Sequence, residues 1–357
     1  MVKVLNPIKI LGIMSGTSLD GIDLALCSFG RNHSDWSYKI LNVLTLPYPA
    51  DISDSLNNAI HMKSEDLLSL DHTYGKWIGR ISGKFLSDTK MEAHWIASHG
   101  HTVFHQPSKG FTLQIGNGND IAALTGIPVI YDFRSMDIAL GGQGAPLVPA
   151  GDEYLFGKYD SCLNLGGISN ISYKMENRRI AFDICPVNMG LNYIAGKMGL
   201  TYDKDGEAGR NGKIIPVILD QLNALDYYEK NPPKSLGREW FIKHVEPLLN
   251  QNYDLRDILR SFYEHIALQI SNILNKTGGK NVFITGGGAK NKLLIELIRQ
   301  KIRCEIIIPE QNLVDFKEAL VFAFLGYLRI NNIVNVFSSV TGCSEDHCAG
   351  LIVKGKV

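Results

Sequence analysis

The amino-acid sequence predicts an α/β protein of two domains, and three observations carry that prediction. The chain has 357 residues, which suits two domains better than one and allows a sizeable core. Residues 9–29 read as a strand, a turn rich in Gly and hydroxyl residues, and a second strand. The same order of strand, Gly-containing turn and strand recurs at residues 161–175. The two segments share a pattern rather than residue identity.

The first part of the chain continues with a mixture of strands and helices. Residues 39–48 are a candidate third strand beside the opening pair, and helical patterns run through residues 51–90. Two short apolar stretches, 94–100 and 127–133, have the length and composition of further strands. Residues 134–151 are rich in Gly and Pro, so we place the crossing between domains near this segment.

The second part repeats this organisation. Residues 178–186 predict a strand that follows the second Gly turn. Apolar residues at four-residue spacing predict an amphipathic helix over 257–276. Residues 281–298 read as an apolar strand, three consecutive glycines and a new helix, and residues 315–330 predict a helix that is apolar nearly all round and therefore buried.

Composition narrows the functional class. The chain has 36 basic and 36 acidic residues, so no net charge attracts it to nucleic acid or to an anionic membrane. No apolar run approaches the roughly 20 residues that span a bilayer, and the first residues lack the pattern of a signal peptide. The six cysteines are scattered without a C-x-x-C pair, and only proximity recommends Cys343 and Cys348 as a redox pair. These features favour a cytoplasmic protein with reduced thiols.

The turn in residues 12–23, GIMSGTSLDGID, has the composition of a phosphate-binding loop. Glycine lets the backbone curve tightly, so that its N–H groups surround a phosphate, and small hydroxyl residues add donors. Asp20 or Asp23 then offers the oxygen ligands that Mg²⁺ prefers. The alternative is an ordinary hairpin turn, because Asp20-Gly21 is a strong hairpin signal.

Other ligand signatures are weaker or absent. The sequence holds no G-x-x-x-x-G-K-[ST] loop, and GNGND at 116–120 lacks the third glycine of a dinucleotide fingerprint. His99, His101 and His105 share one face of a predicted strand, but no acidic residue or cysteine lies near them in sequence. We therefore interpret them as hydrogen-bonding or substrate-contact residues rather than zinc ligands.

Asp183 is the candidate catalytic residue. It lies at the end of an apolar strand just after the second Gly turn, where the chain leaves the sheet toward a cleft between domains. A carboxylate there can accept the proton of an attacking hydroxyl or water. The alternative is an Asp that only accepts hydrogen bonds from the next turn.

These residues carry a resemblance to a known family. The chain resembles the anhydro-N-acetylmuramic acid kinase family, within the superfamily of actin, hexokinases and heat-shock ATPases. The resemblance implies a two-domain actin-like (ribonuclease H-like) ATPase fold, each domain a mixed sheet flanked by helices, with the active site in the cleft. It suggests a first domain of residues 1–132 plus 331–357 and a second domain of residues 133–330. The matching segments are 12–26, 98–107, 112–129, 132–149, 163–172, 232–241, 284–291, 315–325 and 340–342.

The resemblance also implies a reaction and its site. Water opens the 1,6-anhydro ring of anhydro-N-acetylmuramic acid at C1 while O6 takes the γ-phosphoryl group of ATP, giving N-acetylmuramic acid 6-phosphate for cell-wall sugar recycling. The expected cofactors are ATP and Mg²⁺, and the expected assembly is a homodimer that binds neither nucleic acid nor membrane. The implied residues are Asp183 as base; Gly16, Thr17, Ser18, Gly166, Gly167 and Ser169 for phosphates; Gly286, Gly287 and Gly288 for the nucleotide; Asp20 for the metal; and Arg134 and Glu318 for the sugar.

One segment departs from the family pattern. After its catalytic Asp the family reads D-T-G-P-G-N, whereas residues 183–188 read D-I-C-P-V-N. Cys185 and Val187 replace glycines, so we expect a different loop path and a reshaped sugar pocket. The alternatives are a kinase for a related amino or anhydro sugar and, in another class, an inactive nucleotide-binding regulator. Asp20 and Asp183 argue against the inactive regulator, which would need neither carboxylate.

Overall fold

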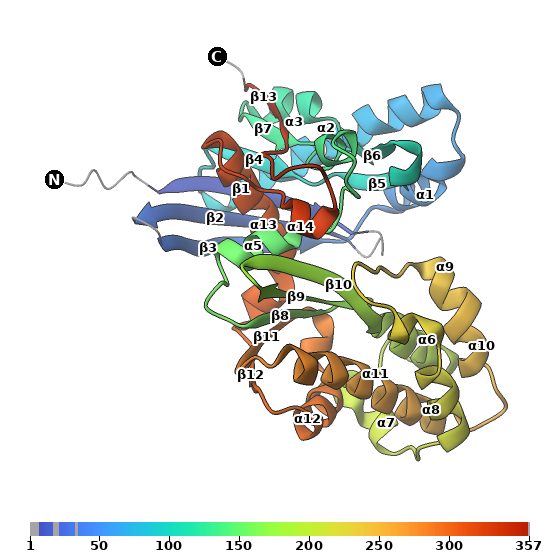
Figure 1. The fold of residues 1–357 in the computed structure, drawn as a ribbon. Coiled ribbons are helices and arrows are strands. Elements are labelled where there is room, and N and C mark those ends of the chain that lie inside the picture. Colours follow the sequence, from blue (N-terminus) through green and yellow to red (C-terminus); the bar gives the residue numbers. More distant parts are fainter. Residues whose placement is uncertain (1–6, 17–20, 33–34, 356–357) are drawn as a thin grey trace. The chain divides into compact units, whose positions relative to one another are not determined.

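The computed structural model describes residues 7–16, 21–32 and 35–355. The chain divides into two compact units. Unit 1 comprises Met1–Leu155 and Phe316–Val357, and unit 2 comprises Phe156–Asp315. In Figure 1, unit 1 is coloured blue to green and then red, and unit 2 runs from green through yellow to orange. The chain passes from unit 1 to unit 2 after Leu155 and returns to unit 1 after Asp315. The boundaries expected from the sequence lay near residues 133 and 331.

The sheet of unit 1 has the strand order β13-β7-β4-β1-β2-β3. β1 pairs antiparallel with β2, and β2 antiparallel with β3, while β1, β4 and β7 run parallel to one another. The short β13 closes the far edge antiparallel to β7. The strands are β1 (Ile8–Ser15), β2 (Ile22–Asn32), β3 (Asp35–Leu46), β4 (Trp95–Ser98), β7 (Val129–Tyr131) and β13 (Leu351–Val353), with β5 (His101–Gln106) and β6 (Phe111–Ile115) forming a separate hairpin.

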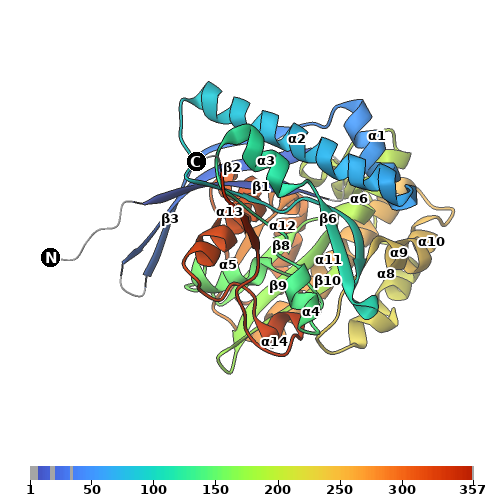
Figure 2. The same ribbon diagram turned by 90° about the horizontal axis from the view of Figure 1, so that it is seen from above.

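Helices cover both faces of this sheet because its central strands are apolar on both sides (Figure 2). Leu11 and Ile13 of β1 belong to the core shared with α1, α2 and α3. Successive residues of a strand face opposite sides of the sheet. Gly12, between Leu11 and Ile13, therefore faces the other side and lies against α13. The helices are α1 (Ala50–Asn58), α2 (Ser64–Thr89), α3 (Gly118–Thr125), α4 (Ser135–Ala139), α5 (Val148–Tyr154), α13 (Gln311–Ile330) and α14 (Ser338–Thr341), with 3₁₀ turns η1 (Ala59–His61) and η2 (Pro107–Lys109).

Helix α13 explains why the unit boundaries differ from those expected. It kinks at Phe316, where the chain passes from unit 2 to unit 1. Its later part is buried, as the sequence predicts. Lys317 of α13 forms a buried ion pair with Asp152 of α5, with 2.7 Å between Nζ and Oδ1. A Cβ at Gly151 would lie 2.5 Å from the Val321 side chain, so α5 packs directly on α13 and belongs to unit 1.

Unit 2 repeats the five-stranded core of unit 1. Its strand order is β10-β9-β8-β11-β12, with β8, β9 and β10 antiparallel and β8, β11 and β12 parallel. The same order and directions appear in β3-β2-β1-β4-β7 of unit 1. The predicted recurrence and the α/β fold class are therefore confirmed. The strands are β8 (Ser161–Leu165), β9 (Ile168–Met175), β10 (Arg178–Pro186), β11 (Asn281–Thr285) and β12 (Glu305–Ile307).

One face of this second sheet is covered mainly by α11 (Leu255–Thr277), as the four-residue apolar spacing predicts. Phe283, on the opposite face, stacks on Phe156 and Tyr159 with ring centroids 4.9 and 4.5 Å away. The remaining elements of unit 2 are α6 (Asn188–Lys197), η3 (Lys204–Gly206), α7 (Glu207–Arg210), α8 (Pro216–Asn223), η4 (Asp226–Glu229), α9 (Arg238–Trp240), η5 (Phe241–Val245), α10 (Glu246–Leu249), η6 (Gly287–Lys290) and α12 (Lys292–Lys301).

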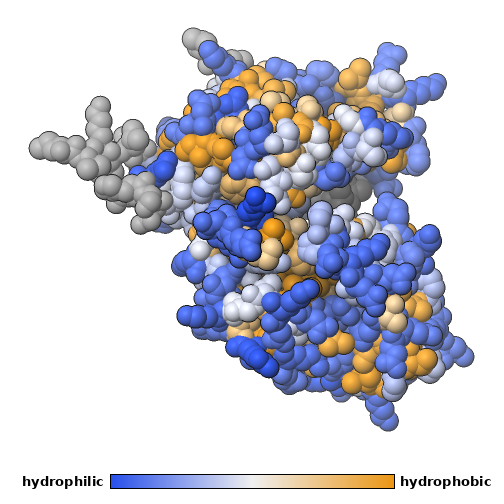
Figure 3. Space-filling view, viewed as in Figure 1, coloured by the Kyte–Doolittle hydropathy of each residue, from blue (hydrophilic) through white to orange (hydrophobic). Residues whose placement is uncertain are grey.

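The surface is mostly hydrophilic on the face shown in Figure 3, with apolar residues in small groups. The exposed large apolar side chains come from separate elements, such as Leu68 on α2 and Tyr202 in unit 2. Among the helices of the described residues, none combines the length and apolarity needed to cross a bilayer.

Candidate functional site

The first Gly-rich turn joins β1 to β2 in unit 1. Gly16 directly follows β1, whereas Thr17, Ser18 and Asp20 lie outside the described residues. The end of β1 is firmly held: Ser15 is buried, and its Oγ lies 2.7 Å from the Tyr48 hydroxyl. The phosphate and metal roles of this turn therefore stay predictions.

Arg134 stands at the start of α4 in a fixed position. Its Nε and Nη2 donate to Nε2 of His99 at 3.1 and 2.8 Å, and its Nη1 donates to the carbonyl oxygen of Gly144 at 2.6 Å. Burial, followed by the charge of Arg134, holds the pKa of His99 well below its ordinary value, so its neutral imidazole can accept. Burial lowers the pKa of Arg134 to about 10, and the carboxylate of Glu318 opposes that shift.

The structure thus brings two predicted sugar contacts, Arg134 and Glu318, into electrostatic interaction within one unit. Glu318 lies on α13 directly after the buried Lys317, and desolvation raises the pKa of its carboxyl. The three histidines singled out in the sequence have separate partners. His101 Nδ1 lies 3.4 Å from Ser15 Oγ and His105 Nδ1 lies 3.2 Å from Thr112 Oγ1, whereas His99 accepts from Arg134.

The second Gly turn joins β8 to β9 in unit 2 and docks on the start of α6. The amides of Val187 and Met189 donate to the carbonyl oxygen of Gly167 at 2.8 and 3.1 Å, and that of Asn188 donates to Gly166 at 3.2 Å. A Cβ at Gly167 would meet no atom within 4 Å among the residues that the structure describes. The carbonyls of the turn therefore anchor it, and its outer side has room for a ligand.

Ser169 makes hydrogen bonds to the backbone of Cys185 that the sequence did not reveal. It is fully buried, and its Oγ donates to the carbonyl of Cys185 at 2.9 Å and accepts from the Cys185 amide at 3.2 Å. These bonds tie β9 to β10 beside the catalytic candidate, where the register shifts between Asp183 and Cys185. The phosphate role expected for Ser169 stays a prediction.

Asp183 lies on β10 and is held by a segment distant in sequence. Its Oδ2 accepts from the amide of Leu236 at 2.9 Å, its amide donates to Lys234 O at 3.3 Å, and its carbonyl accepts from the Tyr227 hydroxyl at 2.7 Å. Burial raises the pKa of Asp183 to about 6, and the bond from Leu236 partly offsets that rise. A carboxylate with this pKa is ionised at neutral pH yet basic enough to accept a proton.

Residues 232–241 are among the segments that match the family, but the sequence did not predict that the segment 227–236 holds Asp183. Lys234 donates from Nζ to Tyr227 O at 3.2 Å, and its ammonium lies 4.6 Å from the centroid of the Tyr227 ring. The adjacent prolines and tyrosines of 227–233 were the available signal. Nothing local in the sequence links them to β10.

The departure at residues 184–188 places no residue at positive φ. Residues 184–186 continue β10, and Val187 is the N-cap of α6 with φ −122° and ψ −94°. Cys185 and Val187 are fully buried. Side chains at these two positions are therefore compatible with the path that this chain takes.

The three consecutive glycines have different environments. Gly286 has φ +83°, and a Cβ there would lie 2.5 Å from the Asn164 side chain. A Cβ at Gly288 would lie 2.8 Å from Leu165. These two glycines let the loop lie flat on the end of β8. A Cβ at Gly287, in contrast, would meet only Asn188 Nδ2 among the described residues, at 3.5 Å.

Gly287 lines a cavity of about 480 Å³ within unit 2. Asp203 shapes one wall, because its carboxylate accepts from the amides of Ala208 and Gly209 at 2.9 and 3.0 Å and from the Tyr263 hydroxyl at 3.1 Å. A pocket of this size with a few fixed polar groups suits a nucleoside. The lining residues are Asn188, Leu191, Asn192, Thr201, Tyr202, Asp203, Lys204, Asp205, Tyr263, Gly287, Lys290 and Asn291.

Replacing Gly287 by Val is expected to weaken ATP binding by about tenfold or more, because the added methyl groups enter this cavity. The fold should persist, since a Cβ at Gly287 makes only an ordinary contact. Isothermal titration with ATP measures the effect. Gly196→Val, at an exposed site of α6 where a Cβ meets no described atom within 4 Å, is the control. Equal ATP affinity in both variants would rule out the cavity as the nucleotide site.

Comparison with known proteins identifies the family. The family model for anhydro-N-acetylmuramic acid kinase matches residues 8–355. The chain belongs to the anhydro-N-acetylmuramic acid kinase family. An anhydro-N-acetylmuramic acid kinase of Mannheimia succiniciproducens is 35% identical, over 96% of this chain and 98% of the relative. One of Sulfurimonas denitrificans is 34% identical over the same shares, and one of Aliivibrio fischeri is also 34% identical over 96% and 98%.

Membership of the anhydro-N-acetylmuramic acid kinase family confirms the resemblance read from the sequence and the prediction of a kinase. The match covers both units and includes β1, β8–β10 and β11 with its glycines.

Proposed function

We propose that the protein is an ATP-dependent kinase that opens the 1,6-anhydro ring of anhydro-N-acetylmuramic acid and phosphorylates O6. The observation that carries the proposal is the carboxylate of Asp183, fixed by Leu236 and with its pKa raised to about 6. It lies in the same unit as the cavity beside Gly287. Family membership supplies the class of sugar.

The reaction assigns a defined proton transfer to Asp183. A water oxygen attacks C1 of the sugar, and its proton passes to the Asp183 carboxylate. The C1–O6 bond breaks, O6 attacks the γ-phosphorus, and ADP leaves with the electron pair of the bridging bond. Arg134, oriented by His99 and Gly144, contributes a fixed positive charge for an anionic group of the sugar.

We propose Mg²⁺ as the accompanying metal, with Asp20 as its protein ligand, directly or through water. The donor set of the first turn fits this ion, since Asp23 at the start of β2 presents another carboxylate, whose Oδ1 is oriented by the Thr45 hydroxyl at 2.5 Å. Bound Mg²⁺ supplies charge neutralisation for the transferred phosphoryl group. The phosphate contacts expected from Gly16, Thr17, Ser18, Gly166, Gly167 and Ser169 are part of the same proposal.

The pH dependence follows from the raised pKa of Asp183. A general base must be ionised, so kcat/KM should fall as pH decreases through about 6. An Asp with an ordinary pKa would lose activity only at lower pH. Initial rates across about two pH units on either side of that value test this. A flat profile there would contradict the assigned pKa.

A sugar panel tests the substrate. Purified protein with ATP and Mg²⁺ should convert anhydro-N-acetylmuramic acid to N-acetylmuramic acid 6-phosphate, as detected by mass spectrometry. The side chains of Cys185 and Val187, which replace family glycines, favour a second candidate, a kinase for a related amino or anhydro sugar. Turnover of only another sugar would support that candidate. Binding of ATP without turnover of any sugar would favour an inactive regulator.

Use of ATP agrees with a cytoplasmic location, and the homodimer stays a prediction.

A further inference from the structure

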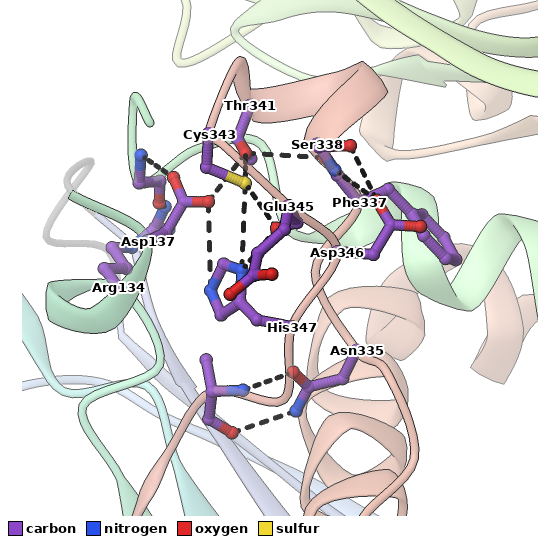
Figure 4. Close-up of polar contacts among 12 residues, drawn as sticks. Arg134, Asp137, Asn335, Phe337, Ser338, Thr341, Cys343, Glu345, Asp346 and His347 are labelled. Carbon is purple, nitrogen blue, oxygen red and sulfur yellow. Dashed lines mark hydrogen bonds and ion pairs between the residues drawn. The ribbon is translucent and has the colours of Figure 1, made fainter. Parts of the chain in front are cut away.

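A buried cluster in unit 1 has the composition of a metal site. Asp137 of α4 meets Cys343 and His347 from the C-terminal segment beyond α14 (Figure 4). Their exposed fractions are 0%, 7% and 8%. The ligand atoms of the three residues lie within 4.8 Å of one another. Neither the phosphate turns nor the Asp183 segment contributes to this cluster.

The distances approach those of a tetrahedral zinc ion. His347 Nε2, the ligand nitrogen, lies 3.9 Å from Asp137 Oδ1, and one ligand atom from each of the three residues lies within 4.8 Å of the other two. Ligands at Zn–N and Zn–S distances of about 2.0 and 2.3 Å stand roughly 3.3–3.8 Å apart in a tetrahedral site. Small side-chain rotations would therefore complete the geometry.

The surrounding hydrogen bonds orient the ligand side chains. Thr341 Oγ1 donates to Asp137 Oδ1 at 2.6 Å, and the Gly144 amide donates to Oδ2 at 2.6 Å. His347 Nδ1 lies 3.2 Å from the carbonyl oxygen of Glu345, which can accept a hydrogen bond from a protonated Nδ1. A proton on Nδ1 leaves Nε2 as the ligand nitrogen, the arrangement that outer partners impose on metal-bound histidines.

A second observation concerns the hydrogen bonding of His347 Nε2. Among the described residues, it has no hydrogen-bond partner, although the side chain is buried and faces the Asp137 carboxylate. A neutral Nε2 lone pair facing an anionic oxygen is unfavourable unless a cation lies between them. The competing explanation is a second proton, which would make His347 an imidazolium paired with Asp137.

We propose that Asp137, Cys343 and His347 bind one Zn²⁺ ion, with water as the fourth ligand. Binding displaces the proton of the Cys343 thiol to solvent, so affinity rises with pH. The ion would join the C-terminal segment to the loop that ends at Gly144, whose carbonyl holds Arg134. Thiolate and imidazole ligands select zinc over Mg²⁺.

Metal binding by the full chain tests the proposal. Protein stripped with a chelator should bind one equivalent of Zn²⁺, and Co²⁺ should give a thiolate-to-cobalt charge-transfer band with the visible bands of a tetrahedral site. Cys343→Ser should remove the charge-transfer band, and His347→Gln should lower affinity by more than about tenfold. Thr341→Val keeps all three ligands but loses the hydrogen bond from the Thr341 hydroxyl to Asp137. It should therefore weaken zinc binding by about 10–100-fold.

Cys348→Ser is the matched control, because this half-buried thiol lies outside the cluster. It should retain both stoichiometry and the cobalt spectrum. Circular dichroism of each stripped variant checks that the fold is intact. Wild-type protein that binds no zinc, or a cobalt spectrum that survives in Cys343→Ser, would overturn the proposal and leave a protonated His347 as the explanation of the cluster.

Discussion

Replacing Asp183 by Asn is expected to lower kcat by at least about a hundredfold, the lower range for loss of a general base. The Asn side chain keeps an oxygen that can accept from the Leu236 amide, so the geometry of β10 and the 227–236 segment should persist. Only the ability to take a proton is lost. Single-turnover kinetics with anhydro-N-acetylmuramic acid measures the chemical step, and titration with ATP should give an unchanged Kd.

A measurement of thermal stability distinguishes the expected loss of kcat in Asp183→Asn from misfolding of the variant. Because burial raises the pKa of Asp183 above its unfolded value, the ionised carboxylate opposes folding at pH above about 6. Asp183→Asn should therefore not lower Tm at neutral pH. Asp220→Asn, an exposed carboxylate on α8, is the matched control and should leave kcat unchanged. Near-normal turnover by Asp183→Asn would remove this residue from the mechanism.

Replacing Gly12 by Ala should destabilise unit 1 by more than about 2 kcal/mol, the scale of overpacking in a rigid core. A Cβ at Gly12 would lie 2.0 Å from the carbonyl oxygen of Ala319 and 2.9 Å from Cβ of Ala323. The first contact is with helix backbone, so no side-chain rotation relieves it. Strand β1 and α13 would have to separate, which displaces Glu318. Denaturant unfolding measures the change.

The same substitution at Gly83 should have the opposite sign. Gly83 lies within α2, and a Cβ there meets no described atom within 4 Å. Ala is favoured over Gly in a helix by about 0.5–1 kcal/mol, so Gly83→Ala should stabilise the protein. If both substitutions had equal effects on unfolding, the close approach of α13 to β1 would be contradicted.

The features that the sequence revealed are those encoded locally. The two Gly turns, the strands around them and α11 follow from apolar spacing and glycine over short windows. Their recurrence in the same order indicated a repeated pattern, and the family resemblance then implied the two-domain α/β fold. The burial of α13 followed in the same way from its composition.

The remaining features depend on contacts between distant residues. Nothing near Asp183 in sequence indicates that Leu236 and Tyr227 hold it, because that support comes from a segment more than forty positions later. The domain boundaries differed because α5 packs on α13, a contact that neither helix reveals alone. Asp137 and Cys343 likewise meet only through folding.

A structure of the complex with a non-hydrolysable ATP analogue, Mg²⁺ and anhydro-N-acetylmuramic acid tests the central claim most directly. We expect the base in the cavity beside Gly287, the phosphates at the two Gly turns, and C1 of the sugar facing the carboxylate of Asp183 across one water. A nucleotide bound away from Gly287, or a sugar whose C1 is out of reach of Asp183, would contradict the account.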